Sequence, residues 1–330
     1  MKGLQQLFAK FKEVKVGVIG DVMLDTYMWG HVDRISPEAP VPIVSLDKKE
    51  YRIGGAGNVA LNLQSLGAQA FVLSVTGKDE DAINLNALFA TSGINVQYSI
   101  QSENRITTNK TRIISRNQQM MRLDSEITFD LNLQEEAALL DSVEQFIAIE
   151  KPDIVILEDY NKGVLTEAVI CSVISICKKA GVLTAVDPKR KNFFTYKGVD
   201  IFKPNLKEVK EALNMLFTDA DQTLLESIHA ELHNLLHHKI SFITLSEKGV
   251  FYKDGKEAKL IPSHVRNIAD VSGAGDTVIA VASLVYAATQ DVYLMAAIAN
   301  IAGGLVCEEV GTAAIDPKRL LDECELLIPV

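Results

Sequence analysis

Apolar runs and amphipathic stretches alternate along most of the chain. In the second half, short apolar runs at residues 153–157 and 183–186 follow stretches of helical periodicity at 134–149 and 166–180. Apolar strands joined by helices are typical of a parallel sheet that is covered on both faces. The pattern therefore predicts an α/β fold.

The first half of the chain extends the same pattern less regularly. Apolar strands are predicted at residues 14–20 and 70–76, and helices at 59–66 and 81–91. Residues 1–12 carry leucine and phenylalanine at helical spacing between lysines, which predicts a short amphipathic helix. These elements place the start of the chain in the same α/β unit.

Two segments interrupt the alternation. Residues 26–52 and 94–125 contain short β-rich pieces without a helical period, such as 43–46 and 111–115. We expect these segments to form a separate small sheet that acts as a lid. No repeat or flexible linker divides the chain, so residues 1–330 are expected to form one domain with that lid.

A glycine turn at residues 270–277 precedes an apolar helix at 278–288. Its centre, Gly273-Ala274-Gly275, lets backbone N–H groups crowd at the positive end of the helix dipole, which favours a bound anion. Asp276 stands at the edge of this turn and is a candidate general base. The alternative is a glycine-rich turn in which the aspartate only caps the helix.

Polar residues follow several of the predicted strands. Asp21 and Asp25 come after the first strand, and polar groups occur again at 158–163, 187–189 and 205–208. In open α/β sheets the carboxyl ends of the strands line the ligand crevice. We therefore expect a ligand site at this edge, with Asp21 and Asp25 as contacts for hydroxyl groups, although a turn residue and a helix cap would look the same.

A second glycine cluster, Gly54-Gly55-Ala56-Gly57-Asn58, lies between the two β-rich segments. Glycines let a ligand approach the backbone, and the Asn58 amide offers both a donor and an acceptor. This cluster alone is weak evidence for a site. It becomes informative only beside the other motifs.

Composition excludes several partners. The net charge of −10 and the isoelectric point near 5.2 argue against nucleic acid or an anionic membrane as the main partner. No apolar run approaches the roughly 18 residues of a membrane span, and the N-terminal residues lack a signal-type apolar core. We expect a cytoplasmic protein.

The cysteines and histidines suggest no metal centre. The 4 cysteines form no C-x-x-C pair and are expected to be reduced thiols. His229, His233, His237 and His238 have spacing that suits a metal, but no acid or thiol partner stands nearby. A solvated helix face is the simpler interpretation.

Together these residues resemble the ribokinase-like (PfkB) family of carbohydrate kinases. The first family motif matches residues 54–77 and the second matches 270–277, while Asn205 and Glu208 match the motif for magnesium-bound phosphate. The resemblance implies a three-layer α/β/α fold with a mostly parallel central sheet and a small β lid. It also implies an ATP-dependent kinase that uses Mg²⁺.

The resemblance assigns roles to particular residues. Asp276 would be the catalytic base, with Gly273, Ala274 and Gly275 supplying the anion-binding amides, and Glu208 would hold the metal through phosphate or water. The residues expected to bind the nucleotide are Asn205, Leu206, Lys207, Glu208, Thr244, Ser246, Glu247, Gly249 and Asn300. Those expected to bind the sugar substrate are Asp21, Asp25, Gly54, Gly55, Asn58, Arg112, Arg116, Arg122 and Lys189.

Four further segments resemble the branch of the family that phosphorylates a heptose 7-phosphate at the anomeric hydroxyl: residues 20–25, 34–42, 115–124 and 299–302. In that case Arg112, Arg116 and Arg122 of the lid, together with Lys189, would bind the phosphate of the substrate. The resemblance also implies a homodimer formed through the lids, and it leaves a monovalent cation open.

Many relatives in this branch carry a second, nucleotidyl-transferring domain with a His-x-Gly-His motif, which these 330 residues do not contain, so we expect the kinase alone. Two alternatives remain at this point. Another sugar or nucleoside kinase of the same fold would keep the core motifs and differ in the lid. A non-catalytic sugar sensor would lack the candidate base and the glycine turn that favours an anion, and both are present here.

Overall fold

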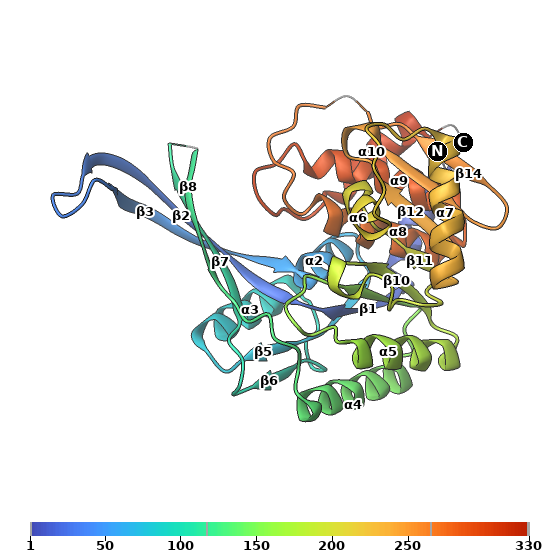
Figure 1. Ribbon diagram of the computed structural model, residues 1–330, viewed down its shortest axis with the longest axis horizontal. Coiled ribbons are helices and arrows are strands. Elements are labelled where there is room, and N and C mark those ends of the chain that lie inside the picture. The colour runs from blue at the N-terminus through green and yellow to red at the C-terminus, as the bar shows by residue number, and fades with distance from the viewer. Residues whose placement is uncertain (1, 117, 265, 329–330) are drawn as a thin grey trace.

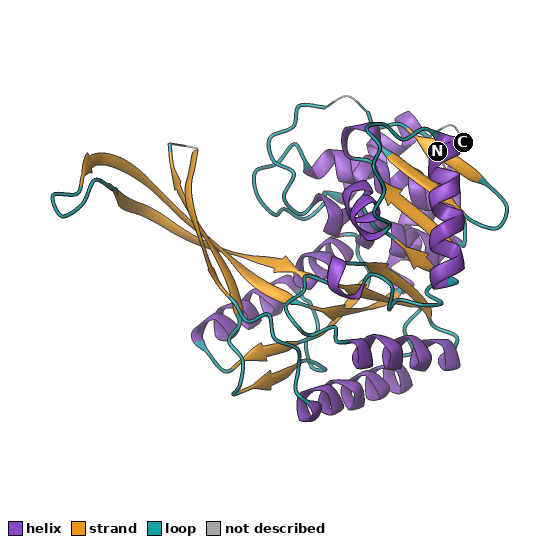
Figure 2. Ribbon diagram, in the orientation of Figure 1, coloured by secondary structure: helices purple, strands orange, loops and turns teal. Residues whose placement is uncertain are grey.

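The computed structural model describes residues 2–116, 118–264 and 266–328, and within them an eight-stranded sheet forms the middle layer (Figures 1 and 2). Its strand order is β14-β13-β12-β11-β10-β9-β1-β4. The parallel strands are β1 (Lys15–Gly20), β4 (Gln69–Leu73), β9 (Ile154–Glu158), β10 (Leu183–Asp187), β11 (Ile201–Phe202) and β12 (Ile240–Thr244). Two antiparallel strands, β13 (Val250–Lys253) and β14 (Ala258–Ile261), complete one edge.

Helices cover both faces of this sheet because its strands are apolar on both sides. In β1, Val16 and Val18 point into one core and Ile19 into the other. The first core is closed by α1 (Lys2–Lys10), α2 (Ala56–Ser65), α3 (Glu80–Ser92), α8 (Ala274–Thr289), α9 (Val292–Val306) and α10 (Pro317–Leu327). The second is closed by α4 (Leu133–Glu150), α5 (Glu167–Ala180), α6 (Leu206–Ala212) and α7 (Gln222–Leu236). Short 3₁₀ turns lie at Phe11–Glu13, Arg190–Asn192 and Ser246–Lys248.

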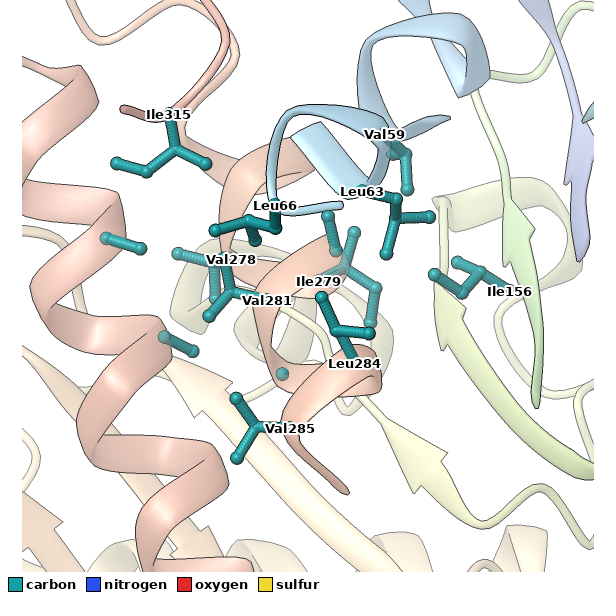
Figure 3. Close-up of a cluster of buried hydrophobic side chains, with 14 of the residues drawn as sticks. Val59, Leu63, Leu66, Ile156, Val278, Ile279, Val281, Leu284, Val285 and Ile315 are labelled. Atoms are coloured by element: carbon teal, nitrogen blue, oxygen red, sulfur yellow. The ribbon is translucent and has the colours of Figure 1, made fainter. Parts of the chain in front are cut away.

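Helix α8 lies inside the first core. It is apolar around nearly its whole circumference, as expected of a helix with protein on every side. Figure 3 shows its side chains packed between α2, β9 and the segment that follows α9. The residues labelled there are Val59, Leu63, Leu66, Ile156, Val278, Ile279, Val281, Leu284, Val285 and Ile315. This packing fixes the position of the helix N-terminus, where the glycine turn lies.

A second sheet extends away from the three layers (Figure 1). Its order is β3-β2-β7-β8, formed by β2 (Val22–Ile35), β3 (Pro42–Gly55), β7 (Thr108–Ser115) and β8 (Gln118–Ser125). Strand β2 starts only two residues beyond the end of β1, so the sheet is rooted at the carboxyl edge of the central sheet. We call these four strands the lid.

The second lid segment is shorter than the expected range of 94–125. Strand β6 (Ile100–Ser102) pairs instead with β5 (Val75–Gly77), which follows a break at Ser74 in the strand expected at 70–76. Ile94 and Tyr98 are buried in the body of the protein and hold this stretch against it. The lid therefore takes only β7 and β8 from the segment.

The histidines near the end of α7 are not all on a solvated face, contrary to expectation. His229 and His238 are buried, and both lie within hydrogen-bond distance of the Ser241 hydroxyl, at 2.8 and 2.6 Å. Burial lowers the pKa of His229 to about 4 and that of His238 to about 3, so both rings are neutral at pH 7. Among the described residues, no three or more His, Cys, Asp or Glu side chains are grouped so as to hold a metal ion.

The expected fold class is confirmed as α/β layers with a mostly parallel central sheet and a separate small sheet. Cys171, Cys177, Cys307 and Cys324 are free thiols. None of the described helices combines the length and apolar character that crossing a membrane requires.

Gly17 provides a test of how tightly the second core is packed. A Cβ atom on Gly17 would come within 2.5 Å of Cε1 of Phe146, and overpacking a filled core typically lowers the free energy of unfolding by about 1–3 kcal/mol. We expect Gly17→Ala to show this loss in urea unfolding. Gly255→Ala is the control, because a Cβ atom on Gly255 would have nothing within 4 Å of it. Equal midpoints for both variants would contradict the described packing.

Candidate active site

The carboxyl ends of β1, β9 and β10 meet below the N-terminus of α8. Gly20, Glu158 and Asp187 are direct neighbours in the sheet register. Gly273 caps α8 with φ 78°, a left-handed conformation that favours glycine. A Cβ on Gly275 would lie 3.6 Å from Oδ2 of Asp187, so the glycine turn sits directly over the end of β10.

Asp276 lies in the first turn of α8 and is buried. Its Oδ2 accepts a hydrogen bond from Nδ2 of Asn58 at 2.7 Å, and its Oδ1 accepts one from the Tyr160 hydroxyl at 2.6 Å. Burial raises the pKa of the Asp276 carboxyl to about 6, while the two hydrogen bonds oppose that rise. Burial also raises the pKa of Tyr160 well above its usual value, so the phenol remains a donor. A carboxylate poised near neutral pH suits a general base.

The Asn62 side chain forms hydrogen bonds to both glycine motifs. Its Nδ2 donates to the Asn58 carbonyl oxygen at 2.8 Å, and its Oδ1 accepts from the Thr277 hydroxyl at 3.1 Å. Asn62 therefore fixes α2 against the first turn of α8. Sequence reasoning missed it, although its place one helical turn after Asn58 was a usable signal.

A chain of alternating charges lies beside Asp276. Asp187 pairs with Lys203 at 2.9 Å and with Lys189 at 3.3 Å, and Lys189 also pairs with Glu208 at 2.9 Å. Lys203 is almost completely buried, which requires the carboxylate beside it. Lys203 is not among the residues expected from the sequence, although a lysine directly after the apolar Ile201–Phe202 strand was a visible signal.

Glu158 is the one buried carboxyl in this cluster for which both oxygens lack a hydrogen-bond partner within the described residues. Burial, followed by the negative charges of Asp187 and Asp276, raises its pKa well above the usual value. These effects favour the protonated form of Glu158. The cluster then holds less negative charge around the anion turn than its residue types suggest.

Asn205 and Glu208 form a reciprocal cap on α6. The Asn205 side chain accepts from the Glu208 N–H, and Oε2 of Glu208 accepts from the Asn205 N–H, both at 2.8 Å. Leu206 and Lys207 follow in the first turn, and Asn205 forms a bridge with Thr244 at the end of β12. The structure therefore brings this part of the expected nucleotide site together.

The other residues expected to bind the nucleotide come later in the sequence. Ser246 and Glu247 belong to the 3₁₀ turn after β12, and a Cβ on Gly249 would lie 2.7 Å from the carbonyl carbon of Pro262. Asn300 of α9 donates to the carbonyl oxygen of the same proline at 2.9 Å. Gly249 and Asn300 thus meet through Pro262.

On the lid side, Asp21 and Asp25 already have partners. The Asp21 oxygens accept from the backbone N–H groups of Tyr160, Lys162 and Val164, at 2.8 to 3.1 Å. Asp21 thereby shapes the loop that carries Tyr160. Its expected contact with a sugar stays a prediction.

Asp25 binds Arg112 at 2.5 Å. Gly54 is next to it, because a Cβ there would collide with Oδ2 of Asp25. Gly55 has φ 59° and precedes α2, which carries Asn58 to the base. The root of the lid therefore lies beside the glycine turn that carries Asp276.

The four cations expected to bind a phosphate do not all lie together, although Arg112 of β7 and Arg122 of β8 are direct neighbours in the sheet register. Arg122 makes two hydrogen bonds to Asp124, at 2.8 and 2.9 Å, whereas Lys189 pairs with Glu208, one of the residues expected to bind the nucleotide. Arg116 is exposed in the turn between β7 and β8, where Asn117 lies outside the described residues. Each of the other three is drawn to a nearby carboxylate, which sequence spacing did not reveal.

Transfer of a phosphoryl group needs a positioned base, amides that receive developing charge, and a surface that excludes water. Asp276 and the N–H groups of the glycine turn are candidates for the first two of these requirements. The chain belongs to the pfkB family of carbohydrate kinases, because the sequence model of that family matches residues 14–319. The expected family and enzyme class are thereby confirmed.

Two curated relatives are the bifunctional proteins HldE. The protein from Geotalea uraniireducens is 38% identical over 98% of this chain, and that from Desulfatibacillum aliphaticivorans is 39% identical over 94%. The chain spans only 65% and 63% of these relatives. Among solved structures, phosphofructokinase-2 from Escherichia coli in complex with potassium has a TM-score of 0.79 at 19% identity, with 94% of this chain and 99% of that chain covered. At that identity the likeness shows the fold.

The hydrogen bond from Tyr160 predicts a change in the pH profile. The phenol stabilises ionised Asp276, so Tyr160→Phe should raise the pKa of that carboxyl above about 6. A hydrogen bond to a charged group is worth about 1.5–3 kcal/mol, which corresponds to a rise of roughly one to two pKa units. We expect the acidic limb of the profile of kcat/KM against pH to move upwards.

Asp159 provides the control for this experiment, because burial raises its pKa to about 6 as well. Its side chain accepts from the Tyr196 hydroxyl at 2.7 Å, not from Tyr160. If the limb moves in Tyr196→Phe and stays fixed in Tyr160→Phe, the limb does not report Asp276.

Proposed function

We propose that this chain is an ATP-dependent kinase that phosphorylates O1 of D-glycero-D-manno-heptose 7-phosphate to the 1,7-bisphosphate. The product belongs to the route to ADP-heptose for the lipopolysaccharide core. The main support is the 36–39% identity to curated HldE proteins over most of this chain. Because the chain spans less than two thirds of those proteins, their second activity is not proposed for it.

In this proposal Asp276 accepts the proton of the anomeric hydroxyl as O1 attacks the γ-phosphate of ATP. Its burial and its contacts with Asn58 and Tyr160 hold the carboxylate in one place. The N–H groups of Gly273, Ala274 and Gly275 would stabilise charge on the phosphoryl oxygens, helped by the dipole of α8. Lys203, buried beside the same turn, would add a fixed positive charge.

The nucleotide would lie along Asn205, Thr244, Gly249 and Asn300. Magnesium fits this side because Mg²⁺ is usually held by one or two carboxylates together with substrate phosphates and water. Glu208 offers such a carboxylate, and the metal would neutralise charge on the transferred phosphate. The potassium in the E. coli phosphofructokinase-2 structure keeps a monovalent cation open for this chain as well.

The lid is proposed to pair with the lid of a second copy into a homodimer. It carries exposed apolar side chains, and pairing would cover unprotected strand edges. These side chains are Ile35, Val41, Leu46, Met120, Met121 and Leu123. A cytoplasmic location is proposed from the sequence features alone.

The decisive experiment is an ADP-release assay over a substrate panel. It includes heptose 7-phosphate, heptose, fructose 6-phosphate, ribose and a nucleoside. We expect the highest kcat/KM with heptose 7-phosphate, and we expect Asp276→Asn to lose about 10²–10⁴-fold in kcat while ATP still binds. A clear preference for another substrate would overturn the heptose assignment, whereas near wild-type turnover by Asp276→Asn would overturn the role of the base.

Glu208→Gln tests the magnesium assignment. A neutral amide binds a hard cation poorly, so the magnesium concentration for half-maximal rate should rise. Because the change also removes the pair with Lys189, Lys189→Gln is measured in parallel. If the magnesium titration is unchanged in Glu208→Gln, or shifts equally in both variants, Glu208 does not serve the metal.

A further inference from the structure

Lys110 is a half-buried cation of lid strand β7 that has no acidic partner among the described residues. Across residues 2–116, 118–264 and 266–328, no carboxylate oxygen lies within 4.0 Å of its Nζ. Its direct neighbours in the sheet register are Asp25 of β2 and Asp124 of β8. Both carboxylates are already bound by arginines, Asp25 by Arg112 and Asp124 by Arg122.

The surroundings of Lys110 disfavour its charge. Burial lowers the pKa of the Lys110 ammonium, and nearby Lys162 and Arg122 lower it further, while Asp25 and Glu126 act in the opposite direction. Glu126 is itself paired with Lys162 at 2.7 Å. A desolvated cation without a counter-ion is unfavourable, and an anion that binds beside it would compensate its positive charge.

Lys110 is also close to the reacting centre. Its Nζ lies 5.3 Å from the centre of the Tyr160 ring, and the hydroxyl of that ring donates to Asp276. Lys189 approaches the same ring to 5.6 Å from the nucleotide side. The Tyr160 ring is thus within reach of a lysine that belongs to the lid and of Lys189, which pairs with Asp187 and Glu208.

We infer that Lys110 binds the phosphate of a sugar phosphate substrate, with the Tyr160 ring separating that phosphate from the base. The inference rests on the proposed function and names the residue that selects a phosphorylated sugar. The arginines suit this role less well, because Arg112 and Arg122 already hold carboxylates and Arg116 is exposed at the tip of the hairpin.

The test compares a phosphorylated sugar with its unphosphorylated form. Calorimetry without nucleotide measures the Kd of heptose 7-phosphate and of heptose for the full chain and for Lys110→Gln. A lost charged hydrogen bond to phosphate should weaken heptose 7-phosphate by about 10- to 100-fold and leave heptose within about 2-fold. Lys110→Arg, which keeps the charge, should retain most of the affinity.

Lys78→Gln is the matched control, because Lys78 is exposed and pairs only with Glu103 among the described residues. It should bind both sugars as the unchanged chain does, and thermal unfolding verifies that each variant is folded. Equal losses for both sugars in Lys110→Gln would overturn the inference. A selective loss of a non-hydrolysable ATP analogue would also overturn it, by placing Lys110 on the nucleotide side.

The outcome can be separated from that of the proposed function. If the substrate panel selects another sugar phosphate, the heptose assignment is wrong, and the calorimetry is repeated with that compound and its unphosphorylated form. If the preferred substrate carries no phosphate, both proposals are wrong. If Arg116→Gln shows the selective loss and Lys110→Gln does not, the inference is wrong, and the phosphate binds at the tip of the hairpin instead.

Discussion

The hydrogen bond between Asn58 and Asp276 joins residues that are 218 positions apart in the chain. It can form only if α2 and α8 pack side by side with their N-termini at the carboxyl edge of the sheet. The apolar surface of α8 makes that arrangement favourable, because the helix buries side chains against α2, β9 and α9 at once (Figure 3). The arrangement of Asn58 and Asp276 therefore depends on the packing of one buried helix.

That packing places a carboxylate where water cannot stabilise its charge. Burial raises the pKa of Asp276, and the Asn58 amide and the Tyr160 phenol offset part of the rise. Lys203 and Lys189 supply compensating positive charge through Asp187, and Glu158 reduces the negative charge by favouring its protonated form. Two carboxylates at this edge, Asp187 and Glu208, are therefore paired with lysines.

In the lid, Asp25 and Asp124 pair with arginines instead of lysines. Arginines pair with the two carboxylates that neighbour Lys110 in the sheet register, so Lys110 has no acidic partner in the described part of the chain. Because β2 begins two residues after β1 ends, a short connection joins the lid to the edge of the central sheet that lies near Asp276. The same strands extend into solvent with apolar side chains exposed, where a second lid could cover them.

The sequence by itself determined the α/β class, the order of most helices and strands, and the turn that carries Asp276. These features follow from local periodicity and from glycine motifs, which a linear pattern preserves. Only the tertiary structure decided which charges pair. Arg112, Arg122 and Lys189 looked like one basic group in the sequence, but the fold gives each a different carboxylate, and it buries His229 and His238 where a solvated face was expected. Pairing and burial depend on neighbours that are distant in the chain, so spacing along the sequence could not predict them.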